Sequence, residues 1–158
     1  MLINGACHCG QISFTAEIDP AQVVVCHCTD CQVLSGSPLR AVAEALIGMF
    51  KIRGSPKRYV FTQHGIRMAQ VFCPKCGTPL YATAQENPTS VIIRLGCVEQ
   101  RAQLKSVIQI WQGSALPWLV ELATVPTSSE QPGALPVPNP SVEPLTSNVR
   151  SRTAWKDS

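Results

Sequence analysis

The sequence predicts a mainly β domain, and two observations indicate this class. Residues 11–18, QISFTAEI, alternate between apolar and polar side chains with a period of two, as a half-buried strand does. Residues 58–62, 67–72 and 90–95 are similarly short, rich in β-branched or aromatic residues, and separated by turns. Residues 41–50, AVAEALIGMF, are ambiguous because their apolar residues are nearly continuous, and we favour a strand that runs into a turn.

The length and the distribution of proline predict one folded domain followed by a tail. A chain of 158 residues is typical of a single ordinary domain with a real core. From residue 123 onward, prolines alternate with serine, threonine, asparagine and glutamate, and no apolar period survives. We therefore expect a folded domain at residues 1–122 and an extended or disordered tail at residues 123–158.

The charge and the apolar pattern exclude some classes of partner. A net charge of +3, from thirteen basic and ten acidic residues, is too small to indicate a nucleic-acid partner. No apolar run approaches the ~20 residues that a membrane helix needs, and the first residues do not form a secretory signal. We expect a soluble, cytoplasmic protein with no membrane partner.

Eight cysteines dominate the chemistry of the sequence. The cytosol keeps thiols reduced, so metal binding is the leading explanation for them. Cysteines one or two residues apart cannot readily form a disulfide with each other, but they can converge on one metal ion. Seven of the eight fall in such close sets, which are Cys7 and Cys9, Cys26, Cys28 and Cys31, and Cys73 and Cys76.

The first and last sets together have the composition of a closed structural zinc site. FCPKCGTPL, at Cys73 and Cys76, has the spacing of a zinc knuckle, and Gly77 lets the backbone bend around the metal. With Cys7 and Cys9 the two pairs supply four thiolates, which fill a tetrahedral site. Such a site stabilises a fold, so we interpret these four residues as structural.

The middle set, in VVVCHCTDCQVLSGSP, then has one ligand fewer than a closed site. Cys26, Cys28 and Cys31 fill three tetrahedral positions, and an open fourth position is typical of a catalytic zinc. Two alternatives remain from spacing alone. Cys97 or a histidine closes the site, or the cysteine sets pair in another way.

The order of these motifs resembles a known family. The segments GACHCGQISF, CHCTDCQVLSGSP, FCPKCGTPL, LGCVEQ and IWQGSALPWL are similar to those of the glutathione-dependent formaldehyde-activating enzymes, whose domain also occurs in centromere protein V. The resemblance spans residues 2–122. It implies a β-rich fold of several small coiled antiparallel sheets, similar to the Rab-binding protein Mss-four.

The resemblance also implies two zinc ions per chain and a role for each. The structural zinc would be bound by Cys7, Cys9, Cys73 and Cys76. The catalytic zinc would be bound by Cys26, Cys28 and Cys31, with a substrate thiol such as glutathione as the fourth ligand. Departures from the family pattern are Cys97 in place of a hydroxyl residue, Gln109 in place of a common histidine, and Leu39 in place of a frequent aromatic residue.

The remaining candidate side chains have ordinary explanations. His8 and His27 each lie between two cysteine ligands, so their side chains are expected to point away from the metal. His64 lies in a predicted turn, and we interpret it as a solvated side chain. A role in proton transfer is the less favoured alternative. The basic residues at positions 51–58 form a solvated face, with guidance of an acidic thiol as the alternative.

Three functions compete at this point. The first is a zinc-dependent carbon–sulfur lyase acting on thiol–aldehyde adducts, with glutathione and formaldehyde as the reference substrates by resemblance. The second is a non-catalytic zinc module for protein or nucleic-acid interaction, which the centromere relative permits. The third, a redox or metal-buffering protein, is disfavoured because the CxxC motif does not open a helix in a βαβ unit.

Overall fold

A computed structural model describes residues 1–63 and 65–131 of the chain. The predictions for His64 and for most of the tail therefore lie outside the described residues. The chain divides into two compact units, Met1–Ala115 and Leu116–Ser158, which are described separately. The predicted domain boundary after residue 122 stays a prediction.

The smaller sheet of the first unit has three antiparallel strands in the order β1-β2-β5. These strands are β1 (Leu2–Ala6), β2 (Ser13–Glu17) and β5 (Phe50–Arg53). In β2 the side chains of Phe14 and Ala16 are buried, whereas Thr15 and Glu17 are exposed. The strand predicted at residues 11–18 is confirmed, with somewhat shorter limits.

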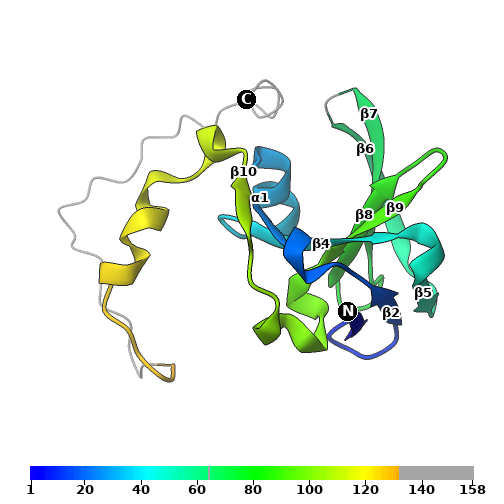
Figure 1. Ribbon diagram of the computed structural model, residues 1–158, viewed down its shortest axis with the longest axis horizontal. Helices are drawn as coiled ribbons and strands as arrows, with labels where there is room; N and C mark the ends of the chain where they lie inside the picture. The colour runs from blue at the N-terminus through cyan, green and yellow to red at the C-terminus, as the bar shows by residue number, and fades with distance from the viewer. Residues whose placement is uncertain (64, 132–158) are drawn as a thin grey trace. The chain divides into compact units, whose positions relative to one another are not determined.

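The larger sheet has seven strands in the order β10-β3-β4-β9-β8-β7-β6, and several of them are labelled in Figure 1. All neighbours are antiparallel except β10 and β3, which are parallel. The bounds are β3 (Val24–Cys26), β4 (Arg40–Leu46), β6 (Lys57–Gln63), β7 (Ile66–Phe72), β8 (Pro79–Ala84), β9 (Ser90–Arg94) and β10 (Ile108–Ile110).

The mainly β prediction is confirmed, and the described residues form one three-stranded and one seven-stranded sheet. The strands expected near residues 58–62, 67–72 and 90–95 are β6, β7 and β9. The ambiguous residues 41–50 contain most of β4, which runs into a short 3-10 helix, η2 (Ile47–Met49), as favoured.

Helical structure in the first unit is short. The α-helix α1 (Thr29–Ser35) was not predicted from the sequence. It begins after Cys28, whose sulfur accepts a hydrogen bond from the backbone, and it ends at Gly36, which adopts a left-handed conformation (φ 62°). The other helices are 3-10 turns, η1 (Pro20–Gln22), η3 (Leu95–Cys97), η4 (Glu99–Gln103) and η5 (Gln112–Ser114).

The two faces of the larger sheet have different roles. On β4, Ala43 and Ala45 belong to the hydrophobic core shared with the smaller sheet. On β9, Val91 and Ile93 belong to the same core. Because successive side chains of a strand point to opposite faces, the intervening positions of both strands point away from this core. They are the positions that line the cavity described below.

In the second unit, η6 (Pro117–Thr124) is a 3-10 helix with proline at its start. Pro117 suits this place because its ring fixes φ and the first helical position needs no amide hydrogen. No helix among the described residues is long and apolar enough to cross a membrane.

Candidate metal centres and their cavity

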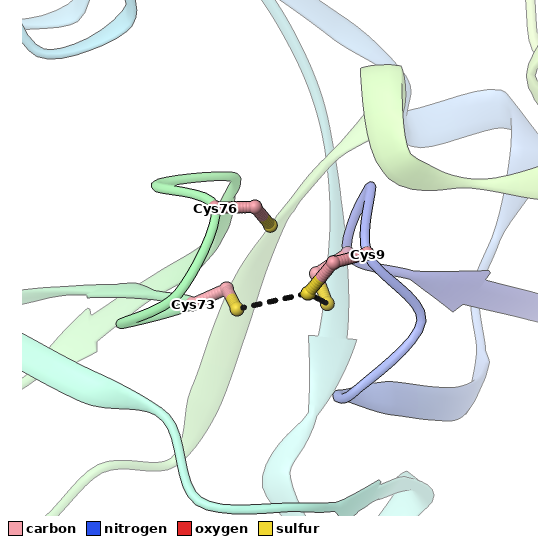
Figure 2. Close-up of side chains that lie close together, drawn as sticks. Cys9, Cys73 and Cys76 are labelled. Atoms are coloured by element: carbon pink, nitrogen blue, oxygen red, sulfur yellow. Dashed lines mark hydrogen bonds between the residues drawn. The ribbon is translucent and has the colours of Figure 1, made fainter.

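Four cysteines from two distant turns meet as predicted. Cys7, Cys9, Cys73 and Cys76 place their sulfurs within 4.8 Å of one another. The sulfur of Cys9 lies 3.5 Å from that of Cys7 and 3.7 Å from that of Cys73. Figure 2 shows Cys9 on one turn pointing toward Cys73 and Cys76 on the other.

Local backbone geometry brings these sulfurs together. In each turn the residue after the second cysteine is a left-handed glycine, Gly10 with φ 75° and Gly77 with φ 72°, a conformation that other residues rarely adopt. The backbone amide of His8 donates to Thr78 Oγ1 at 3.0 Å, which links the two turns. The amide of Ile12 donates to the sulfur of Cys7 at 3.2 Å.

The geometry of this four-cysteine cluster fits zinc. A tetrahedral zinc with Zn–S bonds of ~2.3 Å requires sulfurs about 3.8 Å apart, close to the 3.5 and 3.7 Å observed and far from a disulfide bond. The hydroxyl and backbone amide of Thr78 lower the pKa of Cys76 to about 5, which favours the thiolate that a metal needs.

The second cluster is built from a strand end and a helix start. Cys26 is the last residue of β3, Cys28 caps α1 and Cys31 lies in its first turn. The first turn of the helix brings Cys31 back toward Cys28, whose sulfur accepts the Cys31 amide at 3.4 Å. The three sulfurs lie within 4.8 Å of one another, and Cys26 and Cys28 are buried.

The electrostatics of this three-cysteine cluster keep its thiols protonated unless a cation is bound. The neighbouring thiols of Cys26 and Cys28, together with burial, raise the pKa of Cys31 far above its usual range. The pKa of Cys26 is raised chiefly by Cys28. Three thiolates this close repel one another, and a divalent metal would balance their charge together with the nearby Arg40 and Arg94.

No fourth metal-binding side chain joins this cluster among the described residues. Cys97 lies outside both clusters, with its thiol donating to the Arg94 carbonyl at 3.0 Å, and burial raises its pKa to about 11. His27 is buried, and its Nε2 lies 2.8 Å from Oε1 of Gln109. His8 is exposed. The alternatives that closed the site with Cys97 or with one of these two histidines are therefore not supported.

The three-cysteine cluster opens onto a cavity of about 510 Å³, a size typical of small-molecule sites. Most of the wall is apolar and comes from the face of the larger sheet opposite the core. The apolar wall residues include Val24, Val42, Phe61, Met68, Ile92, Ile108, Ile110 and Trp111. A small molecule in this cavity would reach the cysteines while its body contacts aliphatic and aromatic side chains.

Residues 2–114 match the family described as glutathione-dependent formaldehyde-activating enzyme. The chain belongs to this family. The fold is also similar to that of a crystal structure of a Rhodobacter sphaeroides protein, with a TM-score of 0.54 and 22% sequence identity over 67% of this chain and 98% of that one. At that identity the likeness concerns the fold alone. A comparison with curated proteins finds no match.

Two residues that the sequence analysis singled out, Gln109 and Leu39, do not line this cavity. Gln109 and Leu39 border a second, smaller pocket instead. On β10, Ile108 and Ile110 line the main cavity and Gln109 lies between them, so strand alternation directs it to the other side. Gln109 Oε1 therefore lies 2.8 Å from Nε2 of His27 and accepts a hydrogen bond from Nε2 of Gln112 at 2.8 Å.

The polar residues of the cavity were missed by the sequence analysis. Asp30 and Gln63 line it beside the cysteines, and Gln63 Nε2 donates to Asp30 Oδ2 at 3.1 Å and to the Cys28 sulfur at 3.7 Å. Arg40 and Arg94 line it as buried cations. The sequence could have indicated that both arginines are buried, because each lies in an apolar strand at a position that alternates with core residues.

The basic residues at positions 51–58, which were considered as a means of attracting an acidic thiol, do not line the cavity. Lys51, Arg53, Lys57 and Arg58 are all exposed, and none of them lines the cavity. Their interpretation as a solvated face is the one that the structure favours.

Proposed function

We propose that this member of the family is a zinc-dependent enzyme of the carbon–sulfur lyase type, acting on thiol–aldehyde adducts. Glutathione and formaldehyde are its reference substrates. The observation that carries the proposal is the three-cysteine cluster, which lacks a fourth protein ligand among the described residues and opens onto a cavity of small-molecule size.

The reaction adds a thiol to an aldehyde. It needs neither an oxidant nor a reductant. The thiol sulfur forms a bond to the aldehyde carbon, the carbonyl π bond breaks, and the thiol proton ends on the new hydroxyl oxygen. The reverse reaction cleaves the same carbon–sulfur bond. Zinc bound by Cys26, Cys28 and Cys31 would stabilise a substrate thiolate and polarise the carbonyl.

Asp30 is in the best position to move the proton. It is a half-buried carboxylate on the cavity wall, one residue from Cys31 and two from Cys28. Gln63 fixes it by donating to Oδ2, and the same amide nitrogen reaches the Cys28 sulfur. Asp30 would accept the thiol proton and return it to the developing alkoxide, while the apolar wall limits access of water.

Replacing Cys28 with Ser tests the proposal, with Cys97→Ser as the matched control. Cys28→Ser is expected to lower the zinc content from two ions to one, keep the fold, and abolish exchange between glutathione, formaldehyde and their adduct. Cys97→Ser is expected to retain both zinc ions and the exchange rate. Metal analysis and NMR exchange spectroscopy measure these two quantities.

Unchanged exchange in Cys28→Ser would overturn the proposal. A wild-type protein that contains two zinc ions but neither binds a small thiol nor accelerates exchange would favour the non-catalytic zinc module. Circular dichroism of each variant confirms that a loss of exchange does not come from unfolding.

A further inference from the structure

A buried polar cluster lies on the cavity face of the larger sheet. It consists of Arg40 on β4, Gln70 on β7 and Arg94 on β9, whose exposed fractions are 5%, 4% and 8%. Arg40 and Arg94 both line the cavity that contains the cysteines. Side chains this polar are rarely so deeply buried unless an opposite charge or a hydrogen-bond partner compensates them.

This cluster has more hydrogen-bond donors than acceptors. Gln70 Oε1 accepts from Arg40 Nη1 at 3.2 Å and from Arg94 Nη2 at 2.7 Å. Three further buried nitrogens have no partner among the described residues, namely Arg40 Nη2, Arg94 Nε and Gln70 Nε2. All three are donors, so the missing partner is rich in acceptors.

The cluster also has positive charge without a matching carboxylate, and the negative charge that it faces is that of the cysteine thiolates, which favour the charged form of both guanidinium groups. Within the described part of the chain, the only ion pair joins Arg67 and Glu86, which are both exposed. Of the two acidic residues that line the cavity, Asp30 is bonded to Gln63 and Glu44 is exposed. Burial and the neighbouring Arg40 lower the pKa of Arg94 only to about 10, so it stays charged at neutral pH.

The two arginines lie close to the three-cysteine cluster in the larger sheet. Arg40 lies directly opposite Cys26 in the pairing of β3 with β4. Arg94 lies opposite Val42, which is the next position on the same face of β4. Directly opposed residues in an antiparallel pair have Cα atoms about 4.5 to 5.5 Å apart, so a compact molecule can reach the arginines and the cysteine sulfurs at once.

We propose that Arg40 and Arg94, positioned by Gln70, bind a carboxylate of the substrate, and that the substrate is a compact thiol acid with an otherwise apolar body. A carboxylate would supply acceptor oxygens for the unpartnered donors and a negative charge against the guanidinium groups, whose planar geometry it matches. The apolar remainder of the wall favours one such group over the several charged groups of glutathione. This inference rests on the proposed function for the role of the sulfur.

Binding of 3-mercaptopropionate and of its methyl ester to the zinc-loaded protein tests the inference. The two probes share the thiol and differ in the carboxylate. We expect the acid to bind at least about tenfold more tightly than the ester in calorimetry, because charge-assisted hydrogen bonds form only with the acid. Equal affinities, or tighter binding of glutathione than of the acid, would overturn the inference.

Arg94→Gln is expected to remove the preference for the acid and to leave the affinity for the ester within about twofold. Arg53→Gln, an exposed arginine outside the cavity, is the matched control and should keep the preference. A preference that survives in Arg94→Gln would contradict the assignment.

Gln70→Glu gives a second test that does not depend on losing an arginine. The new carboxylate would lie where Gln70 Oε1 now accepts from both guanidinium groups. We expect the melting temperature to rise and the preference for the acid to disappear, because the protein now supplies the anion itself. A raised melting temperature with an unchanged preference would place the substrate carboxylate elsewhere and overturn the inference.

A probe without a free thiol separates this inference from the proposed function. 3-(Methylthio)propionate retains the carboxylate and has no ionisable sulfur. If it binds to the wild type and not to Arg94→Gln, the carboxylate site stands even when no thiol–aldehyde exchange is observed. If it does not bind while thiols do, the proposed chemistry stands and the carboxylate site is wrong.

Discussion

The two cysteine clusters use the same ligand atom and the same short spacings, yet their surroundings differ. The four-cysteine cluster takes one pair of ligands from each of two turns, and Cys7 and Cys73 belong to the hydrophobic core. The three-cysteine cluster takes all of its ligands from one strand end and one helix, and it opens onto a cavity. A cluster assembled from two distant segments joins them, whereas a local cluster leaves a side free for a substrate.

The largest effect is expected at the four-cysteine cluster. Cys76→Ser should prevent stable folding, because structural zinc contributes on the order of 10 kcal/mol of apparent folding free energy. Circular dichroism and soluble yield would show the loss. If Cys76→Ser folds and melts like the wild type, the four-cysteine cluster is not structural. The expected difference from Cys28→Ser, which should keep its fold, would then be wrong.

Asp30→Asn should affect only the open cluster. The amide can still accept the hydrogen bond from Gln63 but cannot take a proton, so exchange between thiol and aldehyde should fall by about 100-fold or more. Zinc content and melting temperature should stay near those of the wild type. Exchange at the wild-type rate, measured by NMR, would show that another group moves the proton.

Acidification should empty the two clusters at different pH. Each thiol must lose its proton to bind zinc, so a raised thiol pKa lets protons compete at higher pH. In the three-cysteine cluster the pKa values of Cys26 and Cys31 are raised. In the four-cysteine cluster the pKa of Cys9 is raised to about 11, whereas that of Cys7 is lowered and that of Cys76 is lowered to about 5. As the pH falls, the three-cysteine cluster is expected to release its zinc first, before the fold is lost, because it has one sulfur fewer and no thiol with a lowered pKa to match Cys7 and Cys76. A chromogenic chelator and circular dichroism would follow the two events, and simultaneous release would contradict the assignment.

The smallest effect is expected at Cys97. Its thiol donates to a backbone carbonyl and belongs to neither cluster, and a serine hydroxyl can make the same bond. Cys97→Ser should change the free energy of unfolding by less than about 1 kcal/mol. Loss of one zinc ion in this variant would show that Cys97 is a ligand after all.

Much of the fold and the grouping of the cysteines into two clusters could be predicted from local patterns and from the family resemblance. The alternation in β2 and the β-branched content of β6, β7 and β9 are properties of a few consecutive residues. The cysteine spacings are local too, and chemistry limits how they pair. The four-cysteine prediction required only that two pairs complete one tetrahedron.

The rest of the site depends on tertiary structure. Helix α1 has only seven residues, and neither propensity nor apolar period distinguishes so short a helix from a turn. Arg40, Gln70 and Arg94 come from three different strands, so their meeting depends on the order β4-β9-β8-β7 within the sheet. Asp30 and Gln63 are separated by 33 positions and meet only because the end of β6 reaches the start of α1.

Strand β4 has a consequence for how this protein can change during evolution. Its odd-numbered positions 43 and 45 fill the core, while its even-numbered positions 40, 42 and 44 line the cavity. Point substitutions at the even positions can alter ligand preference without a change in core volume. A one-residue insertion or deletion would exchange the two sets, exposing core alanines to the ligand and forcing Arg40 toward the core. New specificities in this fold should therefore arise by substitution along β4 and by length changes only in its flanking loops.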